Sequence, residues 1–214
     1  KAGETARNPE RLSVGVSPEA IADCYKWKPR WKIGHSALCP WHVETHKPVY
    51  LYANTMKTLA IETTGRTGSV ALLLSGDCVA ERRLPAEARS AQSLTLCIKE
   101  LFDREGWSPQ EIDLVAVTRG PGSFTGLRIG VVTAKTIAYA VGAAIVGVNS
   151  LRALAAATGG ATPIWCVMDA QRDECYAAKF FPEEEEKPLR EIETTTILAV
   201  DDWMKRLTPN DRVV

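Results

Sequence analysis

The sequence lacks an excess of charge of either sign and lacks closely paired cysteines. Its 26 basic and 26 acidic residues cancel, so no broad positive field is available to hold nucleic acid by bulk electrostatics. Any contact with RNA is therefore expected to be local or to pass through a partner. The six cysteines include no C-x-x-C pair, which argues against both a zinc ribbon and a dense disulfide framework. We expect reduced thiols in a cytoplasmic protein.

Long hydrophobic runs are also scarce, and one of them is of membrane-spanning length. Ile129–Val148 is a stretch of 20 residues with a single charge, at Lys135, and a stretch of this length can cross a bilayer. Gly142 interrupts it after a helix-length segment, and the residues beyond Gly142 have the pattern of a buried strand. We favour a helix followed by a parallel strand inside an α/β core. A membrane-associated protein is the alternative.

Histidine is absent after His46, and this absence marks a change of composition along the chain. Residues 1–55 hold all three histidines, three of the six tryptophans and five of the twelve prolines. We expect this segment to be a leader from an upstream start, without long regular structure, and the folded domain to begin near Met56. The pattern His42-Val-Glu-Thr-His46 lies in the leader. Because Pro40 and Pro48 leave little room for a helix there, we do not expect it to bind metal.

The segment after Met56 predicts a mixed α/β fold. Turn signals and alternating apolar residues predict three strands joined by hairpins, followed by alternating helices and parallel strands. The predicted strands are 57–62, 68–75, 77–84, 113–118 and 144–148, and the predicted helices are 88–105, 126–141 and 150–157.

The second half of the chain repeats this opening pattern. The repeat comprises predicted strands at 167–169, 175–178 and 191–195, a short helix at 201–207 and a strand from Arg212. Glu62 and Asp169 lie at matching strand ends. Such duplication suggests two ribonuclease-H-like halves that face a cleft. We predict a first domain at 56–160 and an incomplete second domain at 161–214, which ends before its closing helix.

A glycine-rich loop between a predicted strand and a predicted helix is the most informative segment. Backbone N–H groups in such a loop can cradle a phosphate, which suggests a nucleotide loop. The P-loop lysine and the G-x-G-x-x-G spacing are both missing, so a sharp turn capped by Ser123 or Thr125 is the alternative. We interpret the segment as a vestigial nucleotide loop, made of Gly120, Pro121, Gly122, Ser123, Phe124, Thr125, Gly126 and Arg128.

Small residues recur every four positions along the helix that follows this loop. They leave one helix face almost without side chains, so that either a partner helix or this chain's own sheet can approach closely. The helix predicted at 88–105 also has an apolar face. This face either packs in the core or forms part of a partner surface. The candidate partner-interface residues are Gly126, Gly130, Ala134, Ala138, Leu94 and Ile98.

Three motifs resemble one known family. The run Gly120-Pro-Gly-Ser-Phe-Thr-Gly-Leu-Arg-Ile-Gly130, with Met56–Thr64 before it and Met168–Tyr176 after it, closely resembles the TsaB (YeaZ) family of the actin-like ATPase superfamily. The resemblance extends from Met56 to about Val214. It implies a cytoplasmic bacterial protein with the duplicated actin-like (ribonuclease-H-like) fold, in which mixed sheets are flanked by helices.

The resemblance also implies a non-catalytic scaffold role in the modification of ANN-decoding tRNAs with threonylcarbamoyladenosine (t6A) at position 37. The implied partners are a TsaD-type catalytic paralogue, a TsaE-type ATPase and, through the complex, tRNA; the free subunit could be a homodimer. No cofactor is expected to bind tightly to this subunit, and ATP and metal are expected in the partner complex. Glu62, where the family more usually has aspartate, and Asp169 are interpreted as vestigial acids. The alternative is an actin-like ATPase or a glycoprotease-like metallopeptidase that acts on its own.

Overall fold

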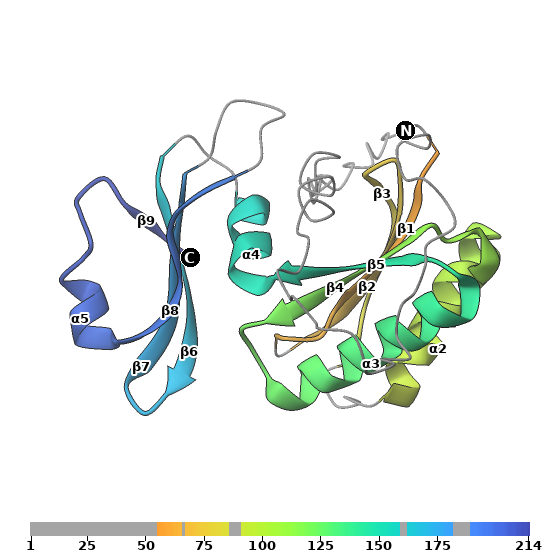
Figure 1. The fold of residues 1–214 in the computed structure, drawn as a ribbon, viewed down its shortest axis with the longest axis horizontal. Coiled ribbons are helices and arrows are strands. Elements are labelled where there is room, and N and C mark those ends of the chain that lie inside the picture. Colours follow the sequence, from red (N-terminus) through yellow and green to blue (C-terminus); the bar gives the residue numbers. More distant parts are fainter. Residues whose placement is uncertain (1–54, 66, 86–90, 159–161, 182–188) are drawn as a thin grey trace, which may run out of the picture.

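The computed structural model describes residues 55–65, 67–85, 91–158, 162–181 and 189–214. Two β-sheets lie side by side, with a helix between them (Figure 1). The predicted leader lies outside the described residues apart from Thr55, and so does the His42–His46 pattern. The predicted domain boundary at residue 160 also falls outside them and stays a prediction.

The first sheet combines antiparallel hairpins with parallel strands. Its strand order is β3-β2-β1-β4-β5. β1 pairs antiparallel with β2 and parallel with β4, and β4 pairs parallel with β5. The bounds are β1 Lys57–Glu62, β2 Ser69–Leu74, β3 Asp77–Arg83, β4 Leu114–Gly120 and β5 Ala144–Asn149. Because β1, β4 and β5 are parallel, their carboxyl ends meet at one edge of this sheet.

Two helices cover one face of the first sheet. α2 (Ala91–Glu105) and α3 (Phe124–Val141) lie beside each other against that face (Figure 1). Leu94 of α2 and Ala134 of α3 are buried in one apolar cluster with Leu59 of β1. Burial of apolar surface, at about 25 cal/mol per Å², therefore holds both helices on the sheet.

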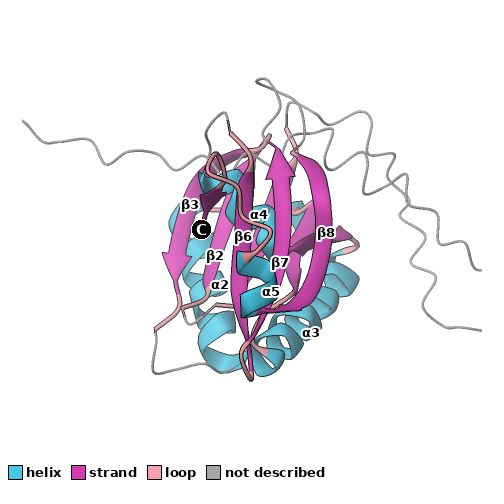
Figure 2. Ribbon diagram, turned by 90° about the vertical axis from the view of Figure 1, so that its left-hand side faces the viewer, coloured by secondary structure: helices cyan, strands magenta, loops and turns pink. Residues whose placement is uncertain are grey.

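The second sheet has one helix on each face. Its strand order is β8-β7-β6-β9, where β6 is Ile164–Gln171, β7 Glu174–Phe181, β8 Arg190–Ala199 and β9 Arg212–Val213. α4 (Ser150–Thr158) packs on the face that looks toward the first sheet, through Leu151 and Ala155. α5 (Val200–Met204) packs on the opposite face through Trp203, and Figure 2 looks onto this face.

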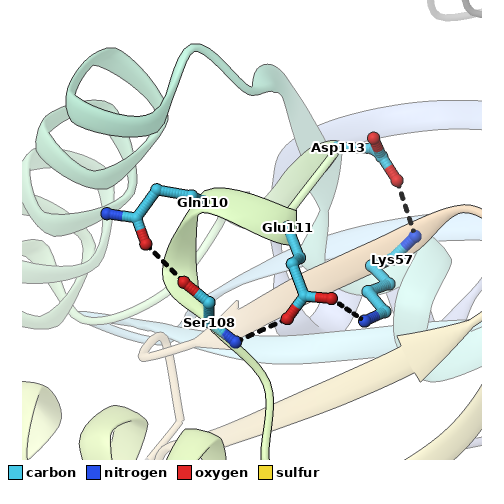
Figure 3. Close-up of polar contacts among 5 residues, drawn as sticks. All are labelled: Lys57, Ser108, Gln110, Glu111 and Asp113. Atoms are coloured by element: carbon cyan, nitrogen blue, oxygen red, sulfur yellow. Dashed lines mark hydrogen bonds and ion pairs between the residues drawn. The ribbon is translucent and has the colours of Figure 1, made fainter.

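A polar cluster fixes the start of β1. The Lys57 N–H donates a hydrogen bond to Asp113 Oδ2 at 3.0 Å, and Lys57 Nζ lies 2.6 Å from Glu111 Oε1 (Figure 3). The other oxygen of Glu111 accepts the Ser108 N–H at 2.7 Å. The hydrogen bond from Lys57 and that from the Ser108 backbone lower the pKa of Glu111 below its ordinary value. The cluster thus ties β1 to the 3₁₀-helix η2 (Pro109–Glu111), which leads into β4.

The apolar stretch 129–148 is divided between a helix and a strand, as favoured above. α3 ends at Val141, Gly142 forms a left-handed cap with φ of 70°, and β5 begins at Ala144. Within the described part of the chain, no helix is long and apolar enough to cross a membrane. The predicted bounds of α3, β6, β7 and β8 were too narrow, because α3 already begins at Phe124 and the three strands pair beyond the predicted residues. The predicted helix 201–207 was too long, because α5 ends at Met204. The predicted class, mixed sheets flanked by helices, is confirmed.

Candidate functional site

The glycine-rich loop packs closely against the turn between β1 and β2. The Ser123 N–H donates to the Thr64 carbonyl oxygen at 3.0 Å. A Cβ on Gly122, which has a φ of 151°, would lie 2.5 Å from the Thr64 Cβ, and a Cβ on Gly126 would collide with the Thr63 carbonyl oxygen. Both positions need glycine because the backbone of the turn approaches them so closely.

α3 begins inside this loop and is capped by one of its residues. Ser123 Oγ accepts the Gly126 N–H at 3.3 Å, as expected for a serine N-cap. Of the two predicted caps, Ser123 is therefore the one used. These contacts favour the sharp-turn interpretation of the loop, because the β1–β2 turn fills the space beside it. A nucleotide-binding role for residues 120–128 stays an untested prediction.

The two acids at matching strand ends each bind the backbone of their own turn. Glu62 Oε1 accepts the Thr64 N–H at 2.5 Å and the Gly65 N–H at 3.2 Å. Asp169 Oδ1 accepts the Gln171 N–H at 2.7 Å. Short polar side chains that satisfy turn N–H groups in this way stabilise the turn. Each acid thus has a local structural role, and among the described residues no hydrogen bond joins the two.

The small-residue stripe of α3 faces this chain's own core. Gly130 is buried against Thr63, where a Cβ would collide with the Thr63 hydroxyl oxygen, and Ala134 is 0% exposed. The apolar face of α2 lies in the same buried cluster. The sheet and the β1–β2 turn cover these side chains in the free chain, which favours core packing over a partner surface. The candidate partner-interface residues are all buried except the half-buried Gly126, and a direct contact of this face with a partner stays an untested prediction; these residues are Gly126, Gly130, Ala134, Ala138, Leu94 and Ile98.

The opposite side of α3 exposes large apolar side chains, and the sequence analysis did not identify it as a surface. Phe124, Val132 and Tyr139 are 73%, 63% and 73% exposed. With 3.6 residues per helical turn, this spacing places them on one side of α3, here called the α3 outer face. The helical periodicity that revealed the small-residue stripe could also have revealed this face. Exposed apolar patches of this kind mark interaction sites.

The buried cysteines of the second sheet are poor nucleophiles. Burial raises the pKa of Cys166 to about 12 and also raises that of Cys175. Because the thiolate is the reactive form, both thiols stay protonated and unreactive near neutral pH. Within the described ranges, no group of three His, Cys, Asp or Glu residues is placed to hold a metal ion.

Comparison with known proteins identifies the family. A family model of TsaD, described as tRNA N6-adenosine threonylcarbamoyltransferase, matches residues 84–209. The tRNA threonylcarbamoyladenosine biosynthesis protein TsaB of Bacillus subtilis is 31% identical over 163 residues, which cover 74% of this chain and 69% of that protein. TsaB of Escherichia coli is 33% identical over 128 residues, which cover 58% of this chain and 55% of that protein.

The fold comparison agrees with the sequence comparison. The structure of YeaZ from Pseudomonas aeruginosa superposes with a TM-score of 0.61 at 27% identity, covering 72% of this chain and 70% of that chain. The chain spans about half the length of the Escherichia coli relative. The TsaD match includes more than half of the chain, and the Bacillus subtilis match covers more than two thirds of that relative. The chain therefore belongs to the TsaB (YeaZ) family, within the broader family that the TsaD model describes.

Proposed function

We propose that this chain acts in the synthesis of t6A at position 37 of ANN-decoding tRNAs, as a scaffold subunit that pairs with a TsaD-type catalytic subunit. The shared name of its relatives, tRNA threonylcarbamoyladenosine biosynthesis protein, supports the process. The observation that supports a partner-binding role is the exposed apolar α3 outer face.

The α3 outer face has the chemistry of an interface core. Full burial of a large apolar side chain contributes about 1.5–3 kcal/mol, and Phe and Tyr are enriched at the centres of interfaces. The exposed Arg128 and Lys135 lie on the same side of the helix, between these apolar side chains, and the Arg128 guanidinium lies 5.6 Å from the centroid of the Phe124 ring. The other side of α3 is anchored in the core, so the outer face is presented by a rigid element, which lowers the entropic cost of binding.

The wider assembly follows from this role. We propose that a TsaE-type ATPase and tRNA join through the complex, and that ATP and metal bind in the partner complex without a cofactor held tightly by this subunit. Self-pairing of the free chain through the α3 outer face would give a homodimer that competes with the heterodimer. The complex would act in the cytoplasm.

Substitution on the α3 outer face should weaken pairing with the catalytic subunit. Tyr139→Ala and Val132→Ala are each expected to weaken binding about 5- to 30-fold, because truncation of a hot-spot side chain costs about 1–2 kcal/mol. The measurement is calorimetric titration of the full chain with a purified TsaD-type subunit. Both side chains are exposed in the free chain, so the melting temperature of each variant should stay close to that of the unsubstituted protein.

Ile192→Ala provides the matched control. Ile192 is an exposed apolar residue, 44% accessible, on β8 of the second sheet. This variant should bind the partner normally. Normal binding by both α3 variants would place the partner surface elsewhere and remove the structural support for the scaffold role.

An ATPase or metallopeptidase acting on its own is the second candidate, because the matching family model describes an enzyme. We expect the isolated full chain to show neither tight Mg-ATP binding nor turnover. The reason is that Glu62 is hydrogen-bonded to Thr64 and Gly65 of its own turn, whereas a catalytic acid here would have to hold a metal-bound water. Calorimetry with Mg-ATP and a phosphate-release assay measure both properties. Tight binding with turnover would favour the enzyme over the scaffold.

A further inference from the structure

An open crevice of about 410 Å³ lies between the two sheets at the carboxyl ends of β4 and β5. We infer that this crevice binds an anionic small molecule, whose phosphate or carboxylate group pairs with the Arg119 guanidinium. The first sheet supplies one wall and β7 and β8 supply the other. The crevice is lined by Arg119, Gly120, Pro121, Asn149, Tyr176, Thr195, Thr196 and Ile197. Its position fits the general rule for open α/β sheets, in which ligands bind outside the carboxyl ends of parallel strands.

Arg119 is the charged group of this crevice. It is exposed near the end of β4, and the lining contains no carboxylate to neutralise it. Among the described residues, its guanidinium forms no ion pair or hydrogen bond. A Cβ on the neighbouring Gly147 of β5 would lie 3.2 Å from Arg119 Cδ. The aliphatic stem of Arg119 therefore rests on a bare stretch of β5 backbone, which limits the positions open to the guanidinium.

Asn149 joins the two walls by a hydrogen bond. Its Oδ1 accepts the N–H groups of Leu151 and Arg152 at 2.9 and 3.1 Å, which fixes the direction of the amide. Its Nδ2 donates to Thr195 Oγ1 at 3.0 Å. Because the Thr195 hydroxyl accepts this bond, its own proton is free to donate to a ligand. Tyr176 lines the same wall, so the Thr195 and Tyr176 hydroxyls are the hydroxyl donors on the wall opposite the arginine.

These groups define the ligand by chemistry. A guanidinium binds phosphate or carboxylate through two parallel hydrogen bonds, and hydroxyl donors on the opposite wall can hold further oxygen atoms of the ligand. The volume lies within the range of small-molecule sites, roughly 300–1,000 Å³, so it accommodates an anion attached to an organic body. Pro121, Ile197 and the Tyr176 ring offer apolar contacts for that body. The crevice contains no residue of the α3 outer face. The experiments on anion binding therefore test this inference independently of the proposed scaffold role.

Titration of the full chain with four probes tests this inference. The probes are inorganic phosphate, acetate, ribose 5-phosphate and neutral ribose, with binding followed by nuclear magnetic resonance of the labelled protein. We expect at least one anionic probe to bind saturably, with shifts at Arg119, Tyr176 and Thr195, and ribose not to bind. The order of phosphate and acetate affinities shows which anion the crevice prefers. Tighter binding of ribose 5-phosphate than of phosphate would show that the crevice also contacts the organic body.

Two arginine variants separate a specific site from a general charge effect. Arg119→Ala should lower the affinity for the anionic probe about 10- to 100-fold, because this is the loss typical when a charged hydrogen-bond partner is removed. Arg83→Ala removes an exposed charge from β3, outside the crevice, and should leave binding unchanged. The melting temperatures of both variants establish that they are folded. The inference fails if no anionic probe saturates, if Arg119→Ala binds normally, or if both variants weaken binding equally.

Discussion

Replacing Gly126 by alanine is expected to lower the free energy of unfolding by roughly 1–3 kcal/mol, the usual cost of overpacking. The new methyl group would collide with the Thr63 carbonyl oxygen. This neighbour is a backbone atom of the β1–β2 turn and not the end of a flexible side chain, so the turn or the start of α3 has to move. Urea unfolding followed by circular dichroism measures the change.

Gly65→Ala is the matched control for this prediction, because Gly65 lies in the same turn. A Cβ there would meet its nearest atom, the Thr67 carbonyl oxygen, at an ordinary 3.6 Å, and alanine at an unstrained glycine position changes stability little or raises it. If Gly126→Ala and the unsubstituted chain have the same free energy of unfolding, the glycine-rich loop does not pack closely on the β1–β2 turn. By the same reasoning, Ala134→Leu should destabilise the domain itself, because Ala134 is 0% exposed.

Replacing Asp211 by asparagine is expected to cost about 3–5 kcal/mol, the loss typical when one partner of a buried ion pair is removed. The Asp211 side chain is 2% exposed and lies 2.8 Å from Lys179 Nζ, itself 14% exposed. It also accepts the Trp165 indole N–H at 3.2 Å and the Thr208 N–H at 3.0 Å. The variant leaves the Lys179 charge without its partner and loosens the segment that brings β9 to β6. Urea unfolding at neutral pH measures the loss.

The contribution of Asp211 to the free energy of unfolding should depend on pH. Burial raises the pKa of Asp211, but the hydrogen bonds from Lys179 and Thr208 outweigh burial and lower the pKa overall. A carboxylate whose pKa is lower in the folded state stabilises the protein above its unfolded pKa, about 3.9. This stabilisation is lost as the pH falls through the folded pKa. The unfolding free energies of Asp211→Asn and the unsubstituted chain should therefore converge in acid.

Two further variants distinguish the buried pair from surface charge. Asp202→Asn breaks an exposed pair with Lys205, in which both side chains are more than half accessible, and should change stability little. Combining Asp211→Asn with Lys179→Met removes both charges and should recover part of the loss, because the lysine is then no longer buried without a partner. A single Asp211→Asn variant as stable as the unsubstituted chain would show that the pair contributes nothing to the second sheet.

The order of the elements and the family could be predicted from the amino-acid sequence alone. Alternation of apolar residues specified the strands, and the Ser-Gly-Asp turn specified a hairpin between β2 and β3, because these signals act between near neighbours along the chain. Gly142 separated α3 from β5 for the same reason, since a glycine can adopt the left-handed cap that ends a helix. The run from Gly120 to Gly130 was specific enough to indicate the family.

Which surfaces are buried, and which groups meet, could not be predicted from the sequence and depends on the packing of the folded chain. A stripe of small residues shows that something approaches a helix closely, but its spacing does not show whether the neighbour is a partner or the chain's own β1–β2 turn. Here the neighbour is Thr63, about 60 positions away from the helix in sequence. Arg119 and Tyr176 likewise line one crevice although they belong to different sheets. Such contacts depend on how the sheets, helices and turns pack, because local periodicity specifies a face of an element and not its neighbour.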